Sequence, residues 1–141
     1  MRRIFCVEVF MAEPHKSGED YLEAILVLKT KNGAARPVDV ARHLGVSKPS
    51  VSHAMGILEE NGYVVTSDEG FLEFTEKGQA LADDIYERHV LLTEFLQVTA
   101  GVDRDQAEQN ACRIEHDIDE DVKRGIENWM RKNAGYSGSR K

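Results

Sequence analysis

Apolar residues recur at spacings of three and four along most of the chain, and this spacing places them on one face of a helix. Residues 21–28 are apolar nearly all round, which predicts a mostly buried helix that begins near Ser17. Residues 63–66 and 71–75 are rich in β-branched and aromatic side chains, which favours two short strands. The predicted helices cover residues 20–29, 38–44, 48–60, 76–98, 105–117 and 118–131. The pattern therefore predicts a mainly α protein.

The second and third predicted helices are short and are separated by a turn at Gly45-Val46, which is typical of a helix-turn-helix. Ser47 can cap the later helix, and Pro49 then falls in its first turn, where its missing N–H costs nothing. The two strands follow directly and are joined by residues 67–70, as in a hairpin. This order predicts a winged helix-turn-helix; the alternative is a helical hairpin that serves only for packing.

The formal net charge of −7 argues against a protein that binds nucleic acid with its whole surface. Residues 29–56 nevertheless hold five Lys and Arg residues against a single Asp, so a local basic patch coincides with the helix-turn-helix. Its small polar side chains suit phosphates and base edges. The side chains expected to contact double-stranded DNA are Arg36, Arg42, Ser47, Lys48, Pro49, Ser50, Ser52 and His53.

The remaining composition narrows the setting of the protein. Cys6 and Cys112 are far apart and too few for a disulfide scaffold, which favours a reducing, cytoplasmic environment. No apolar run approaches the ~20 residues that span a bilayer. The expected parts are a disordered or misannotated extension over 1–16, a DNA-binding domain over 17–75, a helical domain over 76–133 and a disordered tail over 134–141.

Cys112, Glu115 and His116 lie at positions i, i+3 and i+4 of a predicted helix, so their side chains would share one face. A thiolate, a carboxylate and an imidazole together form a ligand set for a transition metal. The alternative is a small buried cysteine beside a solvated acid and a solvated histidine.

Asp20 and Glu23 share a face of the first predicted helix, next to its buried surface. Carboxylates in such a place are usually paired or bound to a metal, because burying an unpaired charge is costly. The alternative is that both lie at the solvent edge and stabilise the helix N-terminus. His89 lies in the middle of the long helix, where a lone histidine more often belongs to the core or the surface than to a metal site.

Three helices of one chain thus offer ligand types, and the combination is more specific than any of its parts. With the winged helix, the Arg88-His89 pair and the run from Cys112 to His116 resemble the metal-dependent repressors of the diphtheria-toxin-repressor and manganese-transport-regulator family. The resemblance extends over about residues 17–133 and implies an N-terminal winged helix-turn-helix followed by an α-helical dimerisation domain. The metal ligands that it implies are Asp20, Glu23, His89, Cys112, Glu115 and His116.

The departures from the family pattern concern the metal. Asp20 resembles the manganese-responsive branch, whereas Cys112 stands where that branch usually has a carboxylate. Thr93 and Glu108 stand where the iron-responsive branch supplies Glu and His to a second site, which puts that site in doubt. The third, SH3-like domain of the longer members is expected to be absent.

Carboxylates suit Mn²⁺, and a thiolate suits Fe²⁺, Co²⁺ or Zn²⁺ better. We expect Mn²⁺ or Fe²⁺, with Mn²⁺ slightly favoured and with Co²⁺ or Zn²⁺ as substitutes in vitro. Six ligands would allow two ions per subunit.

The resemblance implies a homodimer that represses metal-uptake genes when a metal ion joins its two domains. The alternative is a winged-helix regulator that responds to an organic ligand or to oxidation of Cys112. A metal-dependent hydrolase is disfavoured because no nucleophile–base pair is recognisable, so no enzyme activity is expected.

Overall fold

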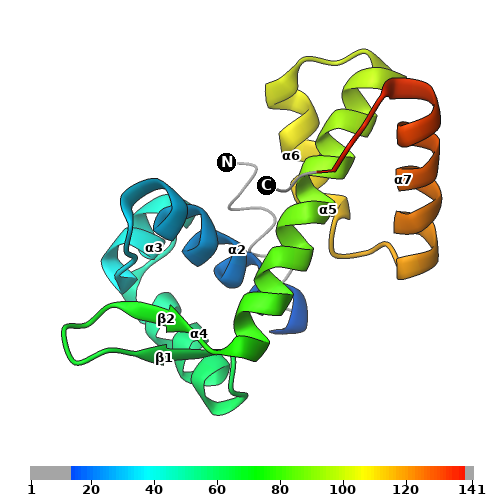
Figure 1. The fold of residues 1–141 in the computed structure, drawn as a ribbon. Helices are drawn as coiled ribbons and strands as arrows, with labels where there is room; N and C mark the ends of the chain where they lie inside the picture. The colour runs from blue at the N-terminus through cyan, green and yellow to red at the C-terminus, as the bar shows by residue number, and fades with distance from the viewer. Residues whose placement is uncertain (1–13, 139–141) are drawn as a thin grey trace. The chain divides into compact units, whose positions relative to one another are not determined.

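The computed structural model describes residues 14–138, and their side chains from residue 18 onward. The described residues form six helices and two strands, which confirms the mainly α prediction (Figure 1). None of these helices is both long enough and apolar enough to cross a membrane. The chain divides into two compact units between Asp83 and Asp84, later than the boundary that was predicted after residue 75.

The first unit is a helix-turn-helix followed by a two-stranded wing. It contains α2 (Pro14–Asn32), α3 (Pro37–Leu44), α4 (Lys48–Glu60), β1 (Val64–Thr66) and β2 (Leu72–Phe74). Helices α2, α3 and α4 pack against one another, and β1 follows α4 and packs against it. The strands are antiparallel, with Val64 opposite Phe74 and Thr66 opposite Leu72. Apolar residues of the helix-turn-helix form its core: Val46 is half-buried, and the buried ones are Val40, Ala41, Leu44, Val51, Met55 and Leu58.

The turn between α3 and α4 has the predicted chemistry. Gly45 ends α3 in the left-handed region, at φ 72°, where a residue with a Cβ would be strained. The Oγ of Ser47 accepts a hydrogen bond from the N–H of Ser50 at 3.2 Å and caps α4. These local bonds fix the angle at which α4 leaves the turn.

The start of α5 (Glu76–Ala100) is joined tightly to the beginning of the wing. Thr75 caps this helix: its Oγ1 accepts from the N–H of Gly78 at 3.0 Å and donates to the carbonyl of Gly62 at 2.6 Å. A Cβ at Gly78 would lie 1.9 Å from the carbonyl oxygen of Tyr63, so only glycine fits there. The first turn of α5 is therefore packed as part of the first unit.

The second unit contains the rest of α5 together with α6 (Arg104–Ile114) and α7 (Glu120–Ala134). Asp103 and Asp119 cap α6 and α7 with side-chain hydrogen bonds of 2.8 and 2.9 Å. Its core cluster consists of Leu91, Met130 and Tyr136. The sequence placed Tyr136 in a disordered tail, whereas the structure buries its ring and joins its N–H to the carbonyl of Met130 at 3.2 Å.

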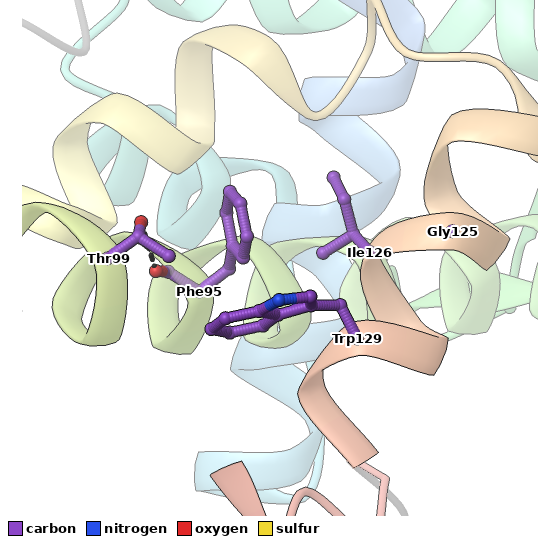
Figure 2. A pocket seen from close by; sticks show the side chains of 5 residues that line it. All are labelled: Phe95, Thr99, Gly125, Ile126 and Trp129. Atoms are coloured by element: carbon purple, nitrogen blue, oxygen red, sulfur yellow. Dashed lines mark hydrogen bonds between the residues drawn. The ribbon is translucent and has the colours of Figure 1, made fainter. Parts of the chain in front are cut away.

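Helices α5 and α7 also line an open groove of about 400 Å³ (Figure 2). Its floor includes Phe95 and Trp129, whose rings meet edge to face with centroids 6.1 Å apart. Gly125 contributes no side chain to the groove, and a Cβ there would meet no other atom within 4 Å. The apolar stripe predicted on the last helix is therefore only partly covered, and 42% of Trp129 is exposed.

Candidate metal and DNA sites

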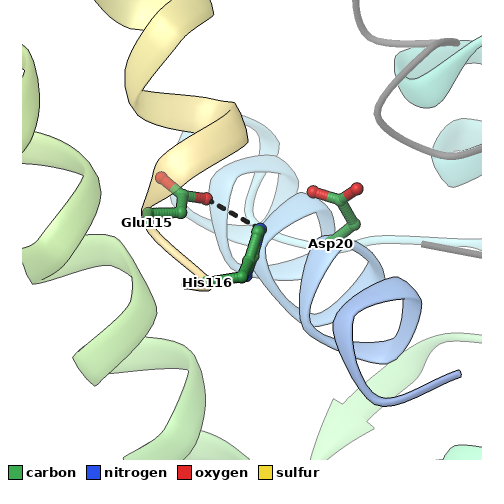
Figure 3. A group of neighbouring side chains, drawn as sticks. All are labelled: Asp20, Glu115 and His116. Atoms are coloured by element: carbon green, nitrogen blue, oxygen red, sulfur yellow. Dashed lines mark ion pairs between the residues drawn. The ribbon is translucent and has the colours of Figure 1, made fainter. Parts of the chain in front are cut away.

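Helix α2 carries three buried carboxylates, Glu19, Asp20 and Glu23, of which the last two are the predicted ligands. Asp20 is 1% exposed and Glu23 is 8% exposed, and Figure 3 labels Asp20 on this helix. Because α2 begins at Pro14, Asp20 lies beyond the first turn, so the alternative role at the helix N-terminus does not apply. Burial raises the pKa of the neighbouring Tyr21 phenol, and the charge of Asp20 raises it further. Two carboxylates in such surroundings are suited to binding a cation.

In the second unit, Glu115 lies between two imidazoles. Its Oε1 is 2.8 Å from Nδ1 of His89. Its Oε2 is 3.3 Å from Nε2 of His116, and Figure 3 shows this second contact. Glu115 is 1% exposed. Carboxylate and imidazole groups that could hold a metal ion include Glu115 with each of these histidines. The long helix thus brings His89 to the same centre as two residues that follow it by more than twenty positions.

The end of α6 differs from the sequence prediction. This helix ends at Ile114, so His116 lies in the following turn and not on a helical face with Cys112. Glu115 keeps helical dihedral angles, and its N–H donates to the carbonyl of Ala111 at 2.9 Å. Cys112 and Glu115 therefore retain the predicted helical relation, while the backbone turns at His116. Cys112 is buried and forms no disulfide within residues 14–138.

Thr93 and Glu108, at the positions of the family's second metal site, lie in surroundings that differ from those of Glu115. Glu108 forms an ion pair with Arg104 at 3.3 Å, and its side chain is 43% exposed. Thr93 is fully buried on α5. An exposed, paired carboxylate is poorly placed as a ligand, which agrees with the doubt raised by the sequence.

Most of the predicted DNA-contacting residues lie at the turn and in the first half of α4, while Arg36 precedes α3 and Arg42 lies in its last turn. Lys48, Ser52 and His53 are exposed on α4. Arg42 forms a 3.4 Å ion pair with Asp39, yet its side chain remains 74% exposed. The guanidinium of Arg36 lies 4.3 Å above the ring of Phe71, so this residue also holds the wing.

The basic patch is smaller than a count of charges suggests. Lys29 forms a 2.7 Å ion pair with Glu73 on β2, which neutralises one of the five positive charges. The wing turn carries Asp68 and Glu69, both exposed. Positive charge available for phosphates is therefore concentrated on the helix-turn-helix and not on the wing.

Comparisons with known proteins place the chain in a family. Residues 15–71 match the profile described as iron dependent repressor, N-terminal DNA binding domain, and residues 75–134 match its metal binding and dimerisation domain. The chain is 35% identical over 105 residues to the HTH-type transcriptional regulator MntR of Lysinibacillus sphaericus. These residues make up 74% of this chain and 75% of MntR. The chain belongs to the iron-dependent repressor family. Its two units are called the DNA-binding unit (to Asp83) and the metal-binding unit (from Asp84) below.

Other family members agree with this assignment. The iron-dependent repressor IdeR of Mycobacterium bovis is 33% identical over 108 residues, which cover 77% of this chain and 47% of IdeR. The structure of the manganese regulator SloR matches with a TM-score of 0.74 at 25% identity, over 81% of this chain and 53% of SloR. The chain thus spans about half the length of both proteins. The family, fold and regulatory class expected from the sequence are confirmed, while the individual ligands and DNA contacts stay predictions.

Proposed function

We propose that this family member is a DNA-binding repressor that responds to Mn²⁺ or Fe²⁺. The observation that carries the proposal is the buried Glu115 carboxylate, whose two oxygens each contact an imidazole. Oxygen and nitrogen donors together suit these divalent ions, and a nearby thiolate would strengthen binding of the later metals. The proposed ligands are Asp20, Glu23, His89, Cys112, Glu115 and His116.

The donor set fits a divalent cation in charge as well as in type. Three carboxylates that lie in buried surroundings repel one another unless a cation or protons compensate their charge. A bound ion supplies that compensation and draws the ligands together. Hard carboxylates favour Mn²⁺, whereas Cys112 favours Fe²⁺, so availability in the cell would select between the two.

The proposed partner is double-stranded DNA, read by α4 in the major groove. Ser47 acts chiefly as the cap of α4, and its hydroxyl donates to Oγ of Ser50 at 3.0 Å. The hydroxyl proton of Ser50 is thereby available for a phosphate oxygen. The other proposed contacts, all exposed, are Arg36, Arg42, Lys48, Pro49, Ser52 and His53.

The proposed mechanism is a population shift. Asp20 and Glu23 belong to the DNA-binding unit, and the other four ligands belong to the metal-binding unit. An ion held by both sets would favour one orientation of the units in a homodimer. Two α4 helices can bind successive major grooves only when they lie about 34 Å apart. The proposed output is repression of metal-uptake genes.

The test is fluorescence anisotropy of the purified protein on labelled DNA from its own upstream region. The protein is first measured in chelator and then titrated with Mn²⁺, Fe²⁺ under anaerobic conditions, Co²⁺ and Zn²⁺. We expect tight binding only with metal. Glu23→Gln should abolish the metal response, and Glu19→Gln, on the same helix and equally buried, should preserve it.

Each outcome of this titration has a separate meaning. DNA binding that is equally tight in chelator would exclude metal gating, and a response to peroxide would then favour regulation by oxidation of Cys112. A normal metal response in Glu23→Gln would remove Glu23 from the ligand set. The folded state of each variant is checked by circular dichroism.

A further inference from the structure

One guanidinium contacts both ends of the turn after α6. Helix C-termini leave carbonyl groups without partners inside the helix. Nη1 of Arg88, on α5, donates to the carbonyl of Glu115 at 3.2 Å and to the carbonyl of Ile118 at 3.4 Å. These two carbonyls begin and end the segment 115–118, which contains His116. One side chain thus spans the turn that carries two of the proposed metal ligands.

The guanidinium is itself held in place. Nη2 of Arg88 contacts Oδ2 of Asp84, one helical turn earlier on α5, at 3.1 Å. Oδ1 of Asp84 accepts from Nζ of Lys123 on α7 at 3.0 Å. The side chain of Lys123 is only 9% exposed. Arg88 therefore cannot leave the turn without losing its ion pair with Asp84, a residue that is itself held by Lys123 of α7.

Two consecutive residues of α5, Arg88 and His89, contact different parts of Glu115. Arg88 binds the backbone of Glu115, and His89 contacts its carboxylate at 2.8 Å. The contact with Arg88 restrains the backbone of Glu115, and the contact with His89 restrains its carboxylate. Such contacts order ligands before an ion arrives, which reduces the conformational entropy lost on binding.

We propose that Arg88 is a positioning residue for metal binding, which orders the turn 115–118 so that Glu115 and His116 present their ligand atoms to the ion. The inference rests on the proposed function, because it concerns the affinity of the same site. Arg88 need not touch the metal itself.

The sign of the expected effect separates positioning from simple electrostatics. Arginine keeps its positive charge at any physiological pH, and a positive charge near a cation site weakens cation binding. Removing that charge would by itself tighten metal binding. Losing an ordered turn would weaken it, and partners of this kind typically change metal affinity 10–100-fold.

The experiment measures Mn²⁺ affinity by isothermal titration calorimetry on the full chain. We expect Arg88→Met to weaken binding about 10–100-fold. Arg88→Lys keeps the charge, but its single nitrogen must replace both Nη1, which contacts the two carbonyls, and Nη2, which contacts Asp84, so an intermediate loss is expected. Arg124→Met is the matched control, because Arg124 lies in the same unit, is 58% exposed and forms an ion pair with Asp121 of its own helix, α7, at 3.0 Å.

A second measurement separates positioning from loss of fold. The absorption spectrum of bound Co²⁺ reports ligand geometry, so Arg88→Met should alter its d–d bands even when the site is saturated. Thermal unfolding in chelator gives the stability of each variant. A variant that is merely less stable would bind Co²⁺ with the wild-type spectrum and affinity.

The outcomes distinguish the two proposals. Unchanged or tighter Mn²⁺ binding by folded Arg88→Met would overturn the positioning role. Should that variant fail to fold, Arg88→Lys decides, because wild-type affinity in it would overturn the role equally. Failure of the wild-type protein to bind any of the metals would overturn the proposed function instead.

Discussion

The candidate DNA contacts and the candidate metal ligand Glu115 are held in opposite ways. In the DNA-binding unit, the candidate DNA contacts are exposed apart from the half-buried Ser50, and local contacts such as the Ser47 cap on Ser50 position residues at the start of α4. In the metal-binding unit, Glu115 is buried and is positioned by Arg88 and His89, which precede it by 27 and 26 residues. The DNA contacts can therefore be exchanged locally, whereas the position of Glu115 depends on the packing of the metal-binding unit.

The largest expected effect is the loss of a ligand from the metal-binding unit. Glu115→Gln removes a buried charge that faces two imidazoles, so we expect Mn²⁺ affinity to fall more than about 100-fold, beyond the usual effect of an outer partner. Glu108→Gln changes the same chemical group at a half-exposed position and should bind Mn²⁺ normally. Titration calorimetry measures both, and equal affinities would show that Glu115 is not a ligand.

Substitutions at two glycines, one in each unit, test how closely other atoms approach the backbone. Gly78→Ala would press a Cβ against the carbonyl of Tyr63, so the free energy of unfolding should fall by about 2–3 kcal/mol. Gly125→Ala places its Cβ in open space on a helix and should raise that free energy by about 0.5–1 kcal/mol. Urea denaturation measures both, and a neutral Gly78→Ala would contradict the close approach.

Ionisation of Tyr136 is expected to destabilise the metal-binding unit at high pH. Burial raises the pKa of its phenol from 10.0 to about 12, and the charges of Glu94, Glu127 and Glu87 contribute. The folded state thus favours the neutral phenol, so this stabilisation is complete below pH 10 and is lost as the pH rises through 12. Phenylalanine has no group that ionises, so between these pH values Tyr136→Phe should lose less free energy of unfolding than wild type does. The expected difference is up to about 2–3 kcal/mol. Urea denaturation between these pH values checks the difference from wild type.

The smallest expected effect concerns two lysines of the basic patch. Lys48 is exposed on α4, so Lys48→Met should reduce the slope of log affinity for DNA against log salt by about 1. Lys29 is already neutralised by Glu73, so Lys29→Met should change the slope much less. Anisotropy at several salt concentrations measures both slopes. Equal changes would mean that the Lys29–Glu73 pair opens on DNA.

Local chemistry explains what the sequence could predict. Gly45, Ser47, Thr75 and Asp103 act within a few residues of their own positions, so the turns and caps that they form were predictable. The winged helix followed from these signals and from helical spacing. The candidate ligands were recognisable because their residue types are unusual on helix faces that also carry apolar residues.

Contacts between distant residues explain what the sequence did not predict. Tyr136 belongs to the core cluster that contains Leu91, and no pattern near the end of the chain indicates that packing. The basic patch was overestimated because Lys29 pairs with a residue 44 positions away. Arg88 was noted only as the neighbour of His89, since its two carbonyl partners become adjacent only after α6 ends and the chain turns.

The joint between Thr75, Gly78 and Tyr63 also decides where the DNA-binding unit can be cut from the chain. A fragment that ends after residue 75 would keep the Thr75 hydroxyl but remove the N–H of Gly78 that it accepts. It would also uncover the carbonyl of Tyr63, against which the helix backbone lies. A fragment that continues to Asp83 keeps the first two turns of α5 as part of its own surface. The natural end of an autonomous DNA-binding fragment is therefore inside a helix and not at the loop that precedes it.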